Sequence, residues 1–188
     1  MARAKSPEKR QAILRSAVRE IAQVGLGAST ARIAAGAGLA EGTMFTYFPS
    51  KDDLLNELYI ELKTEVYRRI NAGFPEDSGL RERARHVWTA YLCWAMEKPD
   101  ERKVSTLLNL SAVVSVATRN RIRVEHGAVA QTMGELDGRG AFKGLPAGFA
   151  SSAMVALQEA VMEMAAKKPR QREMLIEHAF DAFWRMAK

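Results

Sequence analysis

The chain has 188 residues, of which 47% are hydrophobic and 27% are charged. This composition is typical of a folded, soluble protein rather than a disordered one. No stretch approaches the roughly 18 consecutive apolar residues of a membrane-spanning helix. No apolar segment follows the basic N-terminus, so we expect a cytoplasmic protein without a signal peptide. One cysteine and three histidines exclude an internal disulfide and argue against a metal site, and we expect no cofactor.

Positive charge is concentrated in the first quarter of the chain. Residues 1–51 hold eight Lys or Arg and three acidic residues, a net charge of +5, whereas the other 137 residues carry only +1. This asymmetry indicates a polyanionic partner, either nucleic acid or an anionic membrane surface. A solvated basic tail is the alternative. Four of the basic residues fit either a DNA minor-groove arm or such a tail: Arg3, Lys5, Lys9 and Arg10.

The hydrophobic pattern predicts helices in chain order and no clear strand. The first helix covers residues 7–24, with Ser6 as its N-cap and Gly25 beyond its end. Further helices are predicted at about residues 30–35, 41–47, 51–70, 80–97, 100–111, 117–136, 146–167 and 170–188. The helix over 100–111 has an apolar continuation to Val116. The sequence therefore predicts an all-α fold of eight or nine helices.

Residues 29–55 predict two short helices joined by a glycine turn and followed by a capped third helix. The small side chains of Ala34, Ala35 and Ala37 let the short helices approach closely. This is the layout of a helix-turn-helix, in which the second short helix enters the major groove of DNA.

The same segment resembles the TetR family of bacterial transcriptional regulators, and the match covers about 45 residues once the preceding helix is included. The family pattern is Thr-x-x-Ile-Ala-x-x-Ala-Gly, then Gly-Thr-x-Tyr-x-Tyr-Phe, then a lysine. The matching residues are Thr30, Ile33, Ala34, Ala37, Gly38, Gly42, Thr43, Phe45, Tyr47, Phe48, Lys51, Leu54 and Leu55. Phe45 stands where a tyrosine is common and lacks its hydroxyl. Ala40 stands where a capping residue is common, which costs about 1 kcal/mol of helix stability.

Residue chemistry and the resemblance together predict two kinds of DNA contact. Phosphate oxygens are the expected partners of Lys51, which lies at a helix N-terminus, and of the hydroxyls of Tyr47 and Thr30. Arg32 is expected to contact a phosphate or a base. On the recognition helix, Thr43, Phe45 and Thr46 are the expected base contacts. Gly42 lets the helix backbone come close to the DNA. The alternative to these DNA contacts is that Phe45 and Tyr47 only pack in the protein and that Lys51 is an ordinary surface lysine. Met44 and Phe48 fit the core better than the interface.

The resemblance also implies a C-terminal domain that holds a small-molecule effector. We place the helix-turn-helix domain at 1–55, a connecting helix and linker at 56–79, and the ligand-binding and dimerisation domain at 80–188. Aromatic and apolar side chains are the candidate effector contacts, although each of them also fits an ordinary core. They are Trp88, Tyr91, Leu92, Trp94, Leu107, Leu108 and Met133. Cys93 has no nearby resolving cysteine, so a redox role is poorly supported.

The last two predicted helices carry wide apolar stripes. The first stripe contains Phe149, Ala153, Leu157, Ala160 or Val161, and Met164. The second contains Leu175, Ala179, Phe183 and Met186, with Phe180 and Trp184 alongside. The resemblance implies a homodimer joined through these helices, which matches a palindromic double-stranded DNA operator.

The preferred hypothesis is a ligand-responsive repressor that a small apolar effector releases from its operator, without a membrane partner. An enzyme is disfavoured because the chain lacks a glycine-rich phosphate loop, a nucleophile elbow and a metal-ligand cluster. His86 and Cys93 lie seven residues apart, but no third orienting group accompanies them. A non-specific architectural or membrane-surface binder is the alternative, and a comparison of operator with scrambled DNA separates the two.

Overall fold

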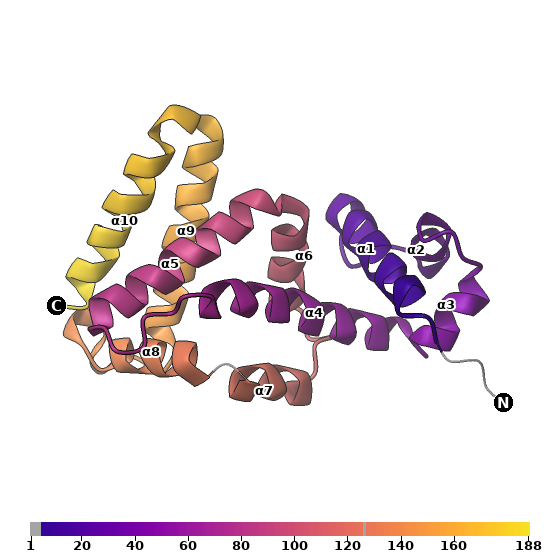
Figure 1. Ribbon diagram of the computed structural model, residues 1–188, viewed down its shortest axis with the longest axis horizontal. Coiled ribbons are helices and arrows are strands. Elements are labelled where there is room, and N and C mark those ends of the chain that lie inside the picture. Colours follow the sequence, from indigo (N-terminus) through magenta and orange to yellow (C-terminus); the bar gives the residue numbers. More distant parts are fainter. Residues whose placement is uncertain (1–4, 126) are drawn as a thin grey trace. The chain divides into compact units, whose positions relative to one another are not determined.

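The structure is a computed structural model that describes residues 5–125 and 127–188 (Figure 1). Its described residues form helices and turns, with no strand, which confirms the all-α prediction. The α-helices are α1 (Pro7–Val24), α2 (Thr30–Gly36), α3 (Glu41–Tyr47), α4 (Lys51–Asn71), α5 (Leu80–Glu97), α6 (Pro99–Leu110), α7 (Val116–Glu125), α8 (Gly127–Asp137), α9 (Phe149–Lys167) and α10 (Arg172–Met186). Two short 3₁₀ segments are η1 (Gly140–Phe142) and η2 (Pro169–Gln171). No helix of the described ranges is long and apolar enough to cross a membrane.

The largest differences from the predicted helix boundaries lie in three places. The single helix predicted over 117–136 is two helices, α7 and α8, and α8 begins at Gly127. Glycine is unfavourable inside a helix and is tolerated at its ends. The predicted continuation from 111 to Val116 is a turn, in which the Ser111 hydroxyl accepts a hydrogen bond from Val113 N. Finally, α9 begins at Phe149, three residues after Pro146.

The chain divides into two compact units. Unit 1 runs to Glu65 and resumes over Lys98–Ile122, and unit 2 comprises Val66–Glu97 and Arg123–Lys188. This division differs from the expected boundaries at 55 and 79, because most of α4, all of α6 and part of α7 belong to unit 1. In unit 1, α6 packs against α1, where Lys103 Nζ donates a 2.6 Å hydrogen bond to the carbonyl of Ala22.

The core of unit 1 is built from the apolar faces that the helical periodicity predicts. Ile13 and Ile21 of α1, Ile33 of α2 and Met44 of α3 are fully buried. Ser6 caps α1 by accepting a hydrogen bond from Lys9 N at 3.3 Å, as predicted. α2 packs against α1, and α3 packs against α2.

A polar residue of α4, Asn56, ties the turn before α7 to unit 1. Its Nδ2 donates to the carbonyl of Val113 at 3.0 Å. Its Oδ1 accepts from Ser115 N at 3.0 Å and from the Thr118 hydroxyl at 2.8 Å. Both polar ends of the Asn56 amide are therefore hydrogen-bonded within the protein. These bonds connect the start of α7 to α4 within unit 1.

Unit 2 surrounds a cluster of aromatic rings from α5, η1 and α10. The rings of Trp88 and Phe183 stack with centroids 6.5 Å apart, and the Phe142 centroid lies 5.5 Å from that of Phe183. Trp88 Nε1 donates a 3.1 Å hydrogen bond to the carbonyl of Ile176. Phe183 is 0% exposed. Phe183, one residue of the predicted α10 stripe, therefore packs in the core of unit 2.

Candidate DNA-binding interface

The turn between α2 and α3 depends on two glycines. Gly38 adopts φ +70°, a left-handed conformation that favours glycine. Gly36 lies so close to α1 that an added Cβ would clash with the Ser16 hydroxyl, and the Gly36 carbonyl accepts a 2.9 Å hydrogen bond from Arg19 Nη2. Ser29 caps α2 through Arg32 N at 3.1 Å. The sequence pattern thus yields the two short helices and the glycine turn expected of a helix-turn-helix.

The recognition helix α3 has one buried side and one open side. Met44 is 0% exposed and Phe48 is also buried, as predicted for core residues. Phe45 is 38% exposed, Gly42 and Thr46 are exposed, and Thr43 is half-buried. Ala40 precedes α3 without a side-chain cap, as expected from its methyl group. The residues predicted to read bases are therefore accessible on α3.

Two hydroxyls near α3 already donate hydrogen bonds within the protein. Thr46 Oγ1 donates to the carbonyl of Thr43 at 2.7 Å, so its lone pairs remain available to accept from a base amino group. Thr30 Oγ1 donates to the carboxylate of Glu41. A phosphate that accepts a hydrogen bond from Thr30 must therefore displace the Glu41 carboxylate. The negative charges of the phosphate and of Glu41 would also repel each other.

The other predicted phosphate contacts have different surroundings. Tyr47 Oη accepts a 3.2 Å hydrogen bond from Ser6 N, which leaves its own proton to donate. Arg32 Nε lies 2.9 Å from Glu20 Oε2, although its side chain remains 60% exposed. Lys51 is the first residue of α4 and is half-buried.

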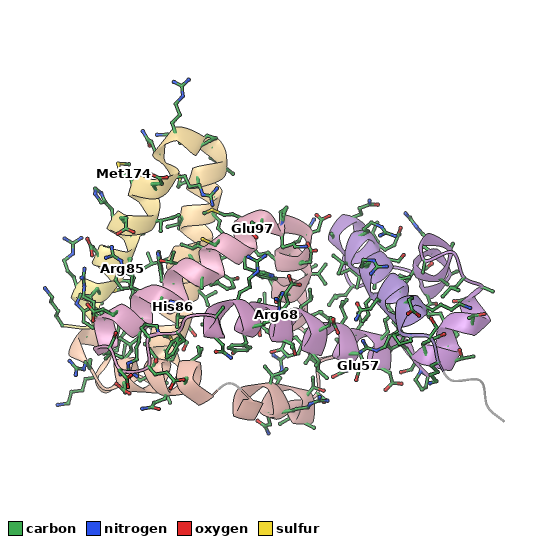
Figure 2. All side chains as sticks on the ribbon, viewed as in Figure 1. Glu57, Arg68, Arg85, His86, Glu97 and Met174 are labelled. Carbon is green, nitrogen blue, oxygen red and sulfur yellow. The ribbon has the colours of Figure 1, made fainter. Side chains whose placement is uncertain are left out.

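The basic residues near the start of α1 differ in their contacts and exposure. Arg10 forms ion pairs with Glu57 at 2.6 Å and with Glu61 at 3.4 Å, and Glu57 lies on α4 (Figure 2). Its guanidinium also lies 5.8 Å from the Phe48 ring centroid. Arg10 therefore stabilises the packing of α1 on α4 rather than belonging to an extended arm. Lys5 and Lys9 are exposed, and Arg3 is outside the described residues.

Gly42→Ala offers a direct test of close DNA approach. A Cβ at Gly42 would meet no atom within 4 Å, and alanine in a helix is up to about 1 kcal/mol more favourable than glycine. We expect unchanged or higher thermal stability but operator affinity reduced at least about tenfold, because the methyl group would meet DNA. Fluorescence anisotropy and thermal denaturation check both effects.

Gly134→Ala is the matched control for this variant. Gly134 lies inside α8, is exposed and also has open space at its Cβ position. It should gain a similar helix stabilisation without changing operator affinity. Wild-type operator binding by Gly42→Ala would place the backbone of α3 away from DNA.

The predicted effector residues divide between the two units. Trp88, Leu92 and Trp94 are fully buried in unit 2, and Tyr91 and Met133 pack against the same cluster. Leu107 and Leu108 belong to unit 1. Trp94 Nε1 is buried without a hydrogen-bond partner among the described residues. Such an indole N–H is suited to an acceptor atom of a ligand.

An exposed apolar surface runs along α9, which packs against α10 in unit 2 (Figure 1). Phe149, Ala156, Ala160 and Met164 are exposed, and their spacing places them along one side of the helix. The buried side of α9 is different and includes Met154 and Val161. On α10, Met174 is also exposed, near the outer end of the helix (Figure 2).

Comparison with known proteins shows which proteins this chain is similar to. Residues 13–58 match the family described as bacterial regulatory proteins, tetR family. The chain is 31% identical over 113 residues to the HTH-type transcriptional regulator BetI of Stenotrophomonas maltophilia, a match that covers 50% of this chain and 58% of that protein. The chain spans about half the length of the curated relatives it matches.

Solved structures extend the likeness to nearly the whole chain. A putative tetR family transcription regulator from Shewanella sp. PV-4 is 29% identical, with a TM-score of 0.77 over 94% of this chain and 96% of that one. LfrR of Mycobacterium smegmatis, solved in complex with proflavine, shares the fold at 21% identity, with a TM-score of 0.65 over 94% and 95% of the two chains. The matched N-terminal segment, the helix-turn-helix geometry and the shared fold make this chain similar to the TetR family of bacterial regulatory proteins.

Proposed function

We propose that this protein is a DNA-binding transcriptional regulator, acting as a repressor that a small-molecule effector releases from a palindromic operator. The observation that carries the proposal is the accessible side of α3. Gly42, Phe45 and Thr46 are exposed there, while Met44 anchors the same helix in the core. A short helix that is held from one side and presents methyl, phenyl and hydroxyl groups on the other suits major-groove reading.

Dimerisation follows from the need to engage two half-sites. A palindromic operator requires two recognition helices about one DNA turn apart, or a multiple of it. The exposed side of α9 supports an interface there, because its apolar residues would otherwise remain in water. Small residues such as Ala156 and Ala160 also allow close helix–helix approach.

An effector site in unit 2 is supported by its aromatic cluster and by the unpartnered indole N–H of Trp94. The LfrR complex with the aromatic molecule proflavine is consistent with such a role for the fold. We propose Trp88, Tyr91, Leu92, Trp94 and Met133 as the unit 2 contacts. Leu107 and Leu108, the other two effector residues predicted from the sequence, belong to unit 1.

Lys51→Ala and Thr43→Ala should affect DNA binding in different ways. Lys51 is proposed to contact phosphate, so its loss should weaken binding to operator and random DNA alike and reduce the salt slope by about one unit. Thr43→Ala should cost about 1–3 kcal/mol on the operator and little on random DNA. Anisotropy titrations of both duplexes at several salt concentrations measure these quantities.

The same titrations test the proposed function as a whole. A sequence-specific regulator should prefer its operator by about a thousandfold or more over a scrambled duplex. Equal affinity of the wild-type protein for both duplexes would instead support a non-specific architectural binder. An unchanged salt slope for Lys51→Ala would place that ammonium away from the DNA backbone.

A further inference from the structure

Two cations of unit 1 lie against the same buried tyrosine. Tyr59 on α4 is 5% exposed. Lys63, one turn further along α4, places its Nζ 5.4 Å from the Tyr59 ring centroid. Arg119 on α7 places its Cζ 5.6 Å from the same centroid. The two cations come from positions far apart in the sequence, and the packing of unit 1 brings them to one ring.

Among the side chains outside residues 123–126, neither cation has a carboxylate partner. Arg119 donates to two backbone carbonyls, at 2.8 Å to Ser111 and at 3.3 Å to Val114. Within the same described ranges, Lys63 forms no hydrogen bond or ion pair, and its one polar contact is the face of Tyr59. By contrast, other arginines of the described ranges pair with carboxylates, among them Arg10, Arg32, Arg69, Arg81, Arg83 and Arg85.

The electrostatic environment leaves this positive charge uncompensated. Burial, together with the neighbouring Arg119 guanidinium, lowers the pKa of Lys63 to about 8. Burial raises the pKa of Tyr59, so its phenol stays neutral at physiological pH and supplies no negative charge. Like charges in a partly desolvated place are unfavourable unless an anion joins them. The ring face of Tyr59 offsets only part of this cost.

We propose that Lys63 and Arg119 form an oxyanion site, which binds a carboxylate or phosphate group through the lysine ammonium and the guanidinium. A guanidinium and an ammonium directed at one oxyanion make charge-assisted hydrogen bonds, which are stronger than those between neutral groups. Arg119 retains donors for this purpose, because only Nε and Nη2 are used by the backbone carbonyls.

The position of the site separates it from the DNA interface. Lys63 lies twelve residues after Lys51 on α4, which is about 18 Å along a helix axis. An operator phosphate at Lys51 is therefore not the bound group. The oxyanion site also consists of residues other than the aromatic cluster of unit 2. A bound anion would join α4 to α7, and α4 is the helix that begins at Lys51, so the anion would act on a helix of the DNA-binding domain.

Isothermal titration calorimetry and NMR of ε-¹³C-labelled lysine test the proposal on the full chain without DNA. The probes are inorganic phosphate, decanoate and the uncharged decanamide, in a chloride buffer. We expect at least one anion to bind saturably and to shift the Lys63 ε-carbon signal, and decanamide to leave that signal unchanged. Binding of phosphate indicates a free oxyanion, whereas binding of decanoate alone indicates the head group of a larger ligand.

Variants assign this binding to the site. Lys63→Met removes the charge but keeps an unbranched side chain, and should weaken anion binding at least about tenfold. Lys63→Arg should bind within about threefold of the wild type, because it keeps the charge. Lys143→Met is the control, because Lys143 is an exposed lysine of unit 2. Failure of both anions to bind, or equal binding by Lys63→Met and Lys143→Met, would overturn the proposal. Because no operator is used, either result is independent of repressor function.

Discussion

Phe183→Asp should unfold unit 2. The Phe183 ring is 0% exposed, stacks on Trp88 and lies 5.5 Å from Phe142. An aspartate at this position would leave a cavity between the rings and bury a charge among aromatic side chains. Each of these effects costs several kcal/mol, and typical domains have only about 5–15 kcal/mol of stability. We expect loss of the cooperative thermal transition and a red-shifted tryptophan fluorescence.

Met174→Asp is the control for this variant. It introduces the same charge on α10, but Met174 is 46% exposed, so the carboxylate stays in water. Surface substitutions of this kind usually change stability by less than about 0.5 kcal/mol. A Phe183→Asp protein with the wild-type melting temperature would show that the ring cluster is not the core of unit 2.

Ala160→Glu should separate the proposed dimer without unfolding the chain. Ala160 lies in the middle of the exposed apolar side of α9, so its replacement disturbs no packing inside the protomer. Two glutamates brought together across a two-fold axis would lose hydration and repel each other. We expect monomers in sedimentation velocity. We also expect operator affinity to fall by about a hundredfold or more. A monomer bound at one half-site no longer holds a second recognition helix close to the other half-site.

Ala166→Glu is the matched control. It makes the same substitution in the same helix at another exposed position, away from the line of Phe149, Ala156, Ala160 and Met164. This variant should remain dimeric and bind operator like the wild type. A dimeric Ala160→Glu protein with wild-type affinity would move the interface to another surface. Thermal denaturation of both variants should match the wild-type chain at low concentration, which separates association from folding.

Local helix signals were sufficient for much of the fold. The predicted bounds of α1, α3 and α5 agree with the structure, because each has a continuous apolar periodicity and a clear stop. Ser6 and Pro7 mark the start of α1, and Gly25 marks its end. In the same way, the spacing around Gly38 was sufficient to predict the helix-turn-helix and the buried position of Met44. Capping, turns and helical periodicity depend on residues near one another in the chain, so a sequence reveals them directly.

Tertiary packing decided which apolar helix faces are buried within the protomer. It also decided which polar side chains are engaged in hydrogen bonds and ion pairs inside the protein. An apolar stripe on a helix looks the same whether it faces its own core or a partner, so the periodicity of α10 did not reveal that Phe183 lies inside unit 2. The Thr30–Glu41 hydrogen bond and the Arg32–Glu20 ion pair depend on how separate helices meet. Lys63 and Arg119 are 56 residues apart in the sequence and carry no shared motif. Their approach to one tyrosine results from the packing of α7 on α4 within unit 1, because contacts between distant residues arise only when the chain has folded.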